Sequence, residues 1–166
     1  ISGANALLSE IAAGHPVIVL QNLGLSWIPV WHYAVVIGYD LDKALIILHS
    51  GITNQKKTAL RTFENTWARS KHWGLAVLPP SRLPATAEEN SYVKAVVGLE
   101  RARQWPAAIE GYKTALSRWS QSLAAHIGLS NSYYAQGDLK SARTVLQKTT
   151  ILFPEEGVAF NNLAHV

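Results

Sequence analysis

The second half of this 166-residue chain repeats itself at a fixed interval. Corresponding positions lie 34 residues apart: Ala95 with Leu129, Leu99 with Tyr133, Ala108 with Ala142, and Tyr112 with Leu146. Ser120 corresponds to Pro154 in the same way, although these two residues differ in character. A third copy begins with Phe160, Leu163 and Ala164. A period of this length predicts a stack of helical hairpins, because each hairpin has an apolar face that only its neighbour can bury. We expect one repeat over residues 89–122, one over 123–156 and a partial one from residue 157.

The residues in the repeat slots resemble those of the tetratricopeptide repeat (TPR) family. Ala108 and Ala142 are small where the two helices of a hairpin would cross, whereas Val96 occupies a slot that is usually small. The resemblance implies an array that binds a peptide or protein segment on a concave face, which the first helix of each repeat lines. The residues expected on that face are Glu100, Arg101, Asn131, Tyr134 and Asn161. The alternative is that these side chains are solvated or make contacts within the array.

Local signals predict where individual helices begin and end. Asp138 follows a glycine at the turn of the second repeat and is placed to cap the next helix. Pro106 is expected in the first turn of a helix. Pro154 is expected to end one helix and open the next, with the two glutamates that follow it in the first turn. Upstream, a proline-rich linker over residues 81–88 precedes the array, and the pair Thr86 and Glu89 predicts a capping box at the first repeat helix.

The first half, residues 1–80, has the pattern of a helix followed mostly by strands. Apolar residues at helical spacing predict a helix that ends at Gly14. Strands are expected over residues 16–20, 32–39 and 44–49, because these runs are continuously or alternately apolar. A further strand over 57–62, a short helix over 63–70 and a final strand over 73–78 complete an α+β domain.

Four segments of this half resemble the second half of a papain-like cysteine peptidase, of the double-glycine type that processes bacteriocins. They are Gly14–Val19, Trp31–Asp40, Phe63–Trp67 and Leu78–Pro79, and the similarity extends over residues 7–80. The resemblance implies the antiparallel-sheet half of such a domain, here followed by the all-α TPR array. Bacterial proteins that join the two exist, and this chain is similar to them. The same resemblance implies a place in the bacterial cell envelope or periplasm.

The resemblance also implies roles for individual residues. His32 matches the family's general base, which takes a proton from a cysteine thiol. The family's orienting Asp matches His49, which cannot act as a carboxylate does, and Asn54 is the candidate that would orient His32 instead. The family's cysteine and oxyanion-hole glutamine lie upstream of Gly14–Val19. We therefore expect this chain to be a fragment of a longer parent.

The composition excludes several kinds of chemistry. The chain contains no cysteine, which excludes disulfides, thiolate metal sites and thiol catalysis by this chain alone. No cofactor is predicted, and a metal site built from His32 and His49 would need further ligands. The remaining histidines of interest have no partners at a useful spacing; they are His15, His72, His126 and His165.

The charge pattern and the lengths of the apolar runs limit the classes of partner that the sequence predicts. The net charge is +4, and the densest basic cluster, which is Lys56, Lys57 and Arg61, lacks the interleaved aromatic residues that stack on nucleic-acid bases. No nucleic-acid partner is therefore predicted. No apolar run approaches the ~18 residues of a membrane span. Trp27 and Trp31 precede His32 and are expected in the core or in the wall of a substrate cleft.

The sequence thus predicts a protein-interaction array attached to a cysteine-peptidase-like domain. In one interpretation the intact parent hydrolyses peptide bonds with His32 as general base, and the array recruits a protein partner. In the other the peptidase-like domain is inactive and the protein is a scaffold or adaptor, an interpretation that His49 favours. The apolar edge left by the third repeat predicts further repeats, a covering surface or a homo-oligomer.

Overall fold

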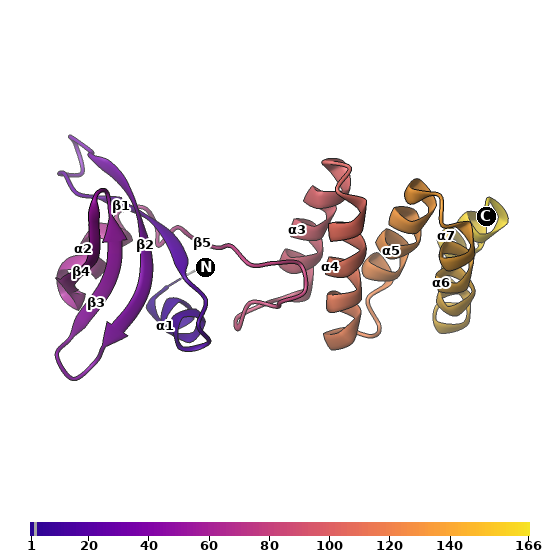
Figure 1. Cartoon of the computed structure of the whole chain (residues 1–166), viewed down its shortest axis with the longest axis horizontal. Coiled ribbons are helices and arrows are strands. Elements are labelled where there is room, and N and C mark those ends of the chain that lie inside the picture. Colours follow the sequence, from indigo (N-terminus) through magenta and orange to yellow (C-terminus); the bar gives the residue numbers. More distant parts are fainter. Residues whose placement is uncertain (2) are drawn as a thin grey trace. The chain divides into compact units, whose positions relative to one another are not determined.

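The computed structural model describes residue 1 and residues 3–166, which form two compact units (Figure 1). The first unit consists of residues 1–78 together with 84–86, and the second consists of residues 79–83 together with 87–166. The chain therefore passes between the units more than once within a few residues. Each unit is described here by itself.

The first unit is an α+β domain built on one antiparallel sheet. Its elements in chain order are α1 (Ala4–Ala12), β1 (Val17–Asn22), β2 (Trp31–Asp40), β3 (Leu45–Ser50), β4 (Thr53–Ala59), α2 (Leu60–Ala68) and β5 (Gly74–Ala76). The five strands lie in the order β4-β3-β2-β1-β5, and every neighbouring pair is antiparallel. The expected α+β class is confirmed.

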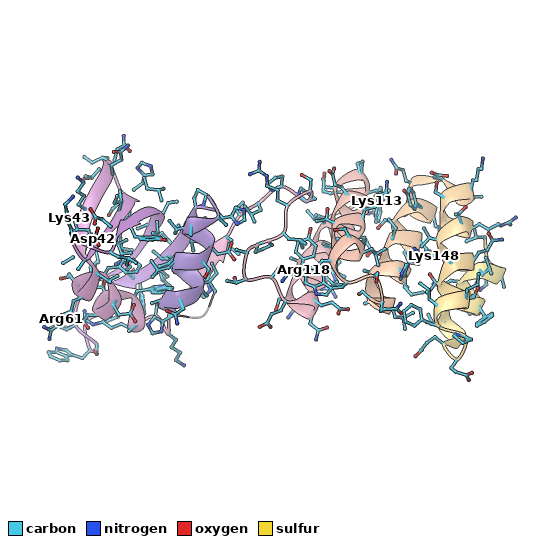
Figure 2. The ribbon with its side chains drawn as sticks, turned by 90° about the horizontal axis from the view of Figure 1, so that it is seen from below. Asp42, Lys43, Arg61, Lys113, Arg118 and Lys148 are labelled. Atoms are coloured by element: carbon cyan, nitrogen blue, oxygen red, sulfur yellow. The ribbon has the colours of Figure 1, made fainter. Side chains whose placement is uncertain are left out.

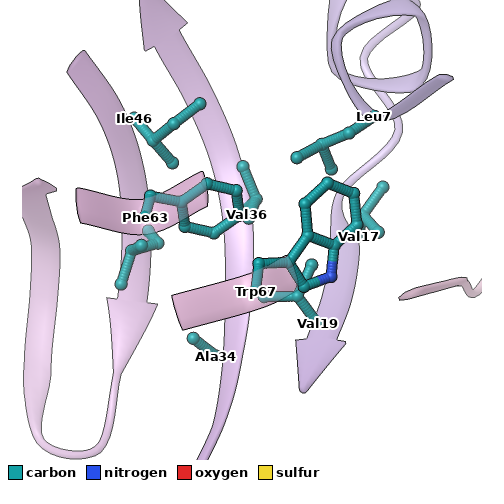
Figure 3. Packing of buried hydrophobic residues seen from close by; sticks show 9 residues of the cluster. Leu7, Val17, Val19, Ala34, Val36, Ile46, Phe63 and Trp67 are labelled. Carbon is teal, nitrogen blue, oxygen red and sulfur yellow. The ribbon is translucent and has the colours of Figure 1, made fainter. Parts of the chain in front are cut away.

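The core of this unit lies between one face of the sheet and the two helices. Leu7 from α1 and Phe63 and Trp67 from α2 pack on alternate residues of β1, β2 and β3, which are Val17, Val19, Ala34, Val36, Ile46 and Leu48 (Figure 3). Trp67 is fully buried, and its indole Nε1 donates a hydrogen bond to the carbonyl oxygen of Trp73 at 2.8 Å. Because side chains alternate between the faces of a strand, the residues between these core positions point to the other face.

The fourth strand differs from its predicted position. It spans Thr53–Ala59, and α2 follows at once from Leu60, so the strand predicted over 57–62 begins too late and runs into the helix. The pairing with β3 is also irregular, because Leu48 lies opposite Lys56 while Ser50 lies opposite Thr53. One residue of β3 thus faces two residues of β4, which is a β-bulge, and Gln55 within it has a left-handed φ of 50°.

The second unit is a stack of helical hairpins in chain order. Its helices are α3 (Glu89–Arg101), α4 (Trp105–Arg118), α5 (Leu123–Gln136), α6 (Leu139–Leu152) and α7 (Gly157–Ala164). The helices α3, α5 and α7 begin at residues 89, 123 and 157, which are the predicted repeat starts. Charged side chains such as Lys113, Arg118 and Lys148 project outward from the stack (Figure 2).

Small residues allow the helices of this unit to approach closely. Ala108 and Ala142 are fully buried, as the repeat pattern predicted. Val96, which is larger than its slot usually permits, fits because Gly111 lies opposite: a Cβ on Gly111 would come within 2.8 Å of Val96 Cγ2. The departure at residue 96 is therefore compensated at residue 111 on the facing helix.

The helix ends confirm some local predictions and overturn others. Asp138 caps α6 by accepting a hydrogen bond from Ser141 N at 3.0 Å, and Pro106 lies in the first turn of α4. Pro154 follows α6 but does not open α7, which begins only at Gly157 with no acidic residue in its first turn. The capping box at α3 was wrong, because the N-cap is Glu88 and the Thr86 side chain bonds elsewhere.

The turn between the two helices of a repeat uses a different residue type in each of the two repeats. Gly137 adopts a left-handed φ of 87° after α5, which costs glycine little. The equivalent position after α3 is Arg103, whose φ is 56°. A non-glycine residue in this conformation costs about 1 kcal/mol. The first repeat therefore carries backbone strain that the second avoids.

Candidate functional site

His32 stands near the start of β2 on the helix-covered face of the sheet. It pairs with Gln21 of β1, and the buried residues Ala34 and Val36 follow it at alternate positions. The ring is half-buried, so it borders the core without being enclosed by it. Its Nε2 atom lies 2.8 Å from the hydroxyl oxygen of Ser50 on β3. Because a hydroxyl both donates and accepts, this contact orients the ring in either tautomer.

Ser50, rather than His49 or Asn54, is the side chain that the structure brings to His32. Ser50 and the buried Leu48 alternate on the same face of β3, so His49 points to the opposite face. There the His49 Nδ1 atom accepts a hydrogen bond from Gln55 N at 3.3 Å. Asn54 is exposed in the β-bulge of β4, and the hydrogen bonds of the described residues do not join it to His32. The pairing of β2 with β3, in which Ala34 lies opposite Ser50, is what brings Ser50 to His32.

The segment before His32 does not enter the core. Residues 22–30 form a tight hairpin, in which the Asn22 side chain accepts hydrogen bonds from Gly24 N at 3.0 Å and Val30 N at 2.9 Å. The hairpin presents Trp27 with 75% of its surface exposed, and Trp31 is 53% exposed at the start of β2. Of the two positions expected for these residues, the core is wrong, because Trp67 fills it, and the wall of a substrate cleft stays a prediction.

Glu10 is a fully buried carboxylate at the end of α1. It accepts hydrogen bonds from Ala85 N at 3.0 Å, from Thr86 N at 2.7 Å and from the Thr86 hydroxyl at 2.5 Å. His15 Nδ1 lies 2.8 Å from Oε2 of Glu10, the oxygen that also accepts the bond from Ala85 N. Burial alone would raise the pKa of Glu10, but the bonds from Thr86, His15 and Ala85 outweigh burial and hold the pKa below its ordinary value. His15 thus has a partner that sequence analysis missed.

His72 and His126 are explained by local contacts. His72 Nε2 lies 2.6 Å from the carboxylate of Glu64, so it too has a partner that the spacing did not reveal. His126 is buried in α5, and its Nε2 lies 3.1 Å from the carbonyl oxygen of Ser120. Burial lowers the pKa of His126, which keeps the ring neutral near pH 7. Within residues 1 and 3–166, no group of three or more His, Asp or Glu is arranged to hold a metal ion.

A hollow of about 370 Å³ lies among α5, α6 and α7 of the second unit. Two of the predicted binding residues, Asn131 and Tyr134, line it, together with Ser130, Leu146, Asn162, His165 and Val166. The predicted Asn161 is exposed on α7, and its neighbour Asn162 lines the hollow instead. The structure therefore brings part of the predicted set together at this place.

The two predicted residues of α3 lie apart from that hollow. Glu100 accepts a hydrogen bond of 2.7 Å from the hydroxyl of the fully buried Tyr112. Burial and this carboxylate together raise the pKa of Tyr112 above its ordinary value, so the hydroxyl stays protonated and fixes Glu100. Arg101 is exposed in the last turn of α3.

Comparison with known families agrees with this division. Residues 2–74 match the model of a Peptidase_C39 like family, and residues 99–163 match the model of the tetratricopeptide repeat. No curated protein matches the chain. The first unit therefore carries a Peptidase_C39-like domain and the second carries TPR repeats, which is the fusion that the sequence predicted. None of the helices in the described part of the chain is both long and apolar enough to span a membrane.

Proposed function

We propose that this chain is a protein-interaction module whose TPR helices bind an extended segment of a partner protein. The observation that supports this proposal is the hollow beside α5 and α7, where Asn131 and Asn162 face the same space. A side-chain amide offers both donors and an acceptor, which suits the alternating groups of a peptide backbone. Tyr134, at 52% exposure, adds an aromatic surface on which the segment can pack.

The nature of the lining narrows the segment that would bind. The side chains that line the hollow are two amides, the hydroxyls of a serine and a tyrosine, a histidine and two aliphatic groups, and none of them belongs to an aspartate, glutamate, lysine or arginine. An uncharged polar segment with one apolar side chain matches that lining. Repeats of this family generally mediate protein–protein interaction, which supports the same assignment.

Site-specific photo-crosslinking tests this proposal. A benzophenone amino acid is placed at position 134 of the complete chain, which is then irradiated in extract of the cells that produce it. We expect a discrete partner adduct that Asn131→Ala weakens about tenfold or more, because side chains that anchor an interface commonly contribute more than 1 kcal/mol. The matched control places the same probe at Lys140, which is exposed on α6 outside the hollow. Equal adducts at both positions would contradict the proposal.

A second function is supported by His32 itself. We infer that His32 serves as general base for a cysteine thiol in the intact parent protein, because its ring is half-buried at the rim of the core and held by Ser50. The cysteine must come from outside these 166 residues, which contain none. A serine hydroxyl stabilises a charged imidazolium less than a carboxylate does, and this favours the inactive adaptor as the alternative.

Thiol reactivity of the full-length protein separates these alternatives. An activated cysteine should react quickly with an electrophilic probe, and His32→Ala should slow that reaction about a hundredfold. Ser50→Ala should slow it only a few-fold, because the hydroxyl orients the ring without taking the proton. Mass spectrometry identifies the labelled residue. Labelling that does not depend on His32 would leave the adaptor as the function of this domain.

A further inference from the structure

A second hollow, of about 320 Å³, lies at the β4 edge of the first unit. The residues that line it come from strands β1, β3 and β4 and from helix α2. Its polar lining consists of the Gln21 amide and of hydroxyls and ammonium groups, which belong to Ser50, Lys56, Lys57, Thr58, Thr62 and Thr66. No aspartate or glutamate lines it.

The sheet register explains why a lysine reaches this place. Lys56 lies opposite Leu48, and Thr58 lies opposite Ile46, whose side chains are buried under α2. Residues directly opposite each other share a face of the sheet, so Lys56 and Thr58 are on the helix-covered face. The β-bulge at Gln55 sets this register, and its left-handed backbone marks a conformation that sequence alone would not favour.

The positive charge in the hollow is not neutralised. Among the ion pairs of residues 1 and 3–166, none involves Lys56 or Lys57. The hydroxyl of Thr66 is the acceptor for the amide Nε2 of the buried Gln21 at 2.7 Å, and it donates to the carbonyl oxygen of Phe63 at 2.8 Å. Thr66 is thereby fixed at the floor of the hollow. The lining therefore offers two ammonium groups and several hydroxyl donors to an anion, and it contains no aspartate or glutamate that would compete for them.

The hollow adjoins His32 through two of its lining residues. Ser50 lines it and also holds the His32 Nε2 atom at 2.8 Å. Gln21, which lines it as well, is the cross-strand partner of His32. A peptide that lies along His32 would therefore place one of its groups at this opening.

We propose that the hollow between β3, β4 and α2 binds a carboxylate of a peptide held beside His32, with Lys56 as the main counter-charge. The carboxylate is either an acidic side chain or the carboxyl end of the peptide, since both present the same two oxygens. This inference deepens the proposed role of the Peptidase_C39-like domain by giving its peptide an acidic group. Lys56 is an exposed lysine on an edge strand, and such a lysine also discourages pairing with other sheets, but that role requires neither the hydroxyls of the hollow nor its connection to His32 through Ser50.

Site-resolved binding by NMR tests the proposal on the complete chain, without any need for cleavage. The probes are three short alanine-based peptides: a capped peptide with one central glutamate, the same peptide with glutamine, and an uncapped peptide with a free carboxyl end. We expect a carboxylate peptide, and not the glutamine peptide, to shift the amide signals of Thr58, Thr62 and Thr66. The signals of Asn131 and Tyr134 report separately on the TPR hollow.

Matched variants decide whether the carboxylate peptide binds in the hollow or is attracted by the overall positive charge of this surface. Lys56→Gln should weaken binding about tenfold, because a hydrogen bond to a charged group is commonly worth that much. Arg61→Gln removes the same charge from the neighbouring exposed surface, where Arg61 projects outward from α2, and should change affinity less than twofold (Figure 2). Thr62→Val, at an exposed position, gives a second readout if Lys56→Gln perturbs the strand.

Each outcome has a defined meaning. Preference for the glutamate peptide or for the free carboxyl end supports the proposal and identifies the source of the carboxylate. Equal binding of the glutamine peptide overturns it, and so does inorganic phosphate that produces the same shifts at the same concentration, because that would indicate an unspecific anion surface. If thiol labelling does not depend on His32 but the carboxylate peptide still binds, the carboxylate site is supported and the domain is an inactive adaptor that binds peptides.

Discussion

Replacing Glu10 with alanine is expected to lower the free energy of unfolding of the first unit by about 3 kcal/mol. The carboxylate is fully buried and accepts three hydrogen bonds from residues 85 and 86 besides its contact with His15. Removing it leaves the buried His15 ring without its partner and opens a buried space. Hydrogen exchange at the indole N–H of Trp67, which is buried in the same unit, measures this loss.

Two control variants separate the effect of the Glu10 charge from the effect of lost side-chain volume and from the effect of any substitution in helix α1. Glu10→Gln keeps the volume but turns a donor toward one of the backbone N–H groups, so an intermediate loss is expected. Ser9→Ala, at an exposed position of the same helix, should change stability by less than about 0.5 kcal/mol. A Glu10→Ala variant as stable as Ser9→Ala would show that the carboxylate contributes nothing.

The free energy of unfolding should also depend on acidic pH through the carboxylate of Glu10. The pKa of Glu10 is lower in the folded protein than its ordinary value of 4.5, so the unfolded chain binds the proton more readily. The stabilisation is therefore complete above about pH 4.5 and is lost as the pH falls through the lower folded pKa. The wild type should lose more stability over that range than Glu10→Ala does.

Replacing Gly128 with alanine is expected to destabilise the TPR unit by about 3 kcal/mol. A Cβ at this position would lie 2.2 Å from Cζ and 2.5 Å from the hydroxyl oxygen of Tyr112, which is fully buried. The ring would have to move, and its hydrogen bond to Glu100 would break. Urea unfolding followed by far-UV circular dichroism measures the loss, because the helices of this unit dominate that signal.

Gly98 provides the matched control for this steric argument. It lies in α3 with no heavy atom within 4 Å of an added Cβ. Gly98→Ala should therefore stabilise the unit by about 0.5–1 kcal/mol, since alanine is the better helix former. Opposite signs for the two alanines support close packing at Gly128, and similar effects would refute it. Combining Gly128→Ala with Tyr112→Ala should cost less than the sum of the single changes.

The repeat half was the easier half to predict, because its information is local and periodic. The 34-residue interval gave the starts of α3, α5 and α7, and Asp138 caps the helix that its position indicated. Two local signals failed: Pro154 does not open α7, and Thr86 fits a local capping rule and yet bonds Glu10, a residue 76 positions away. A buried carboxylate gains more from a hydroxyl donor than an exposed helix end does, and no local pattern contains that comparison.

The candidate site was predicted less completely, because it depends on strand register. His32 was singled out by resemblance, but its partner Ser50 follows from the pairing of β2 with β3, in which Ala34 lies opposite Ser50. The start of β4 was missed because Thr53–Ala59 is polar and exposed at an edge, where a strand has no alternating apolar signal. The bulge that places Lys56 is likewise invisible in a sequence of polar residues.

The interleaved connection between the units has a practical consequence for anyone dividing this protein. Residues 84–86 satisfy Glu10 in the first unit, whereas the carbonyl of Pro80, a few positions earlier, accepts a hydrogen bond of 2.8 Å from Tyr92 in the second. A cut before residue 79 strips Glu10 of its donors, and a cut after residue 86 strips Tyr92 of its acceptor. Separately expressed halves should therefore overlap, one ending after residue 86 and the other beginning before residue 79.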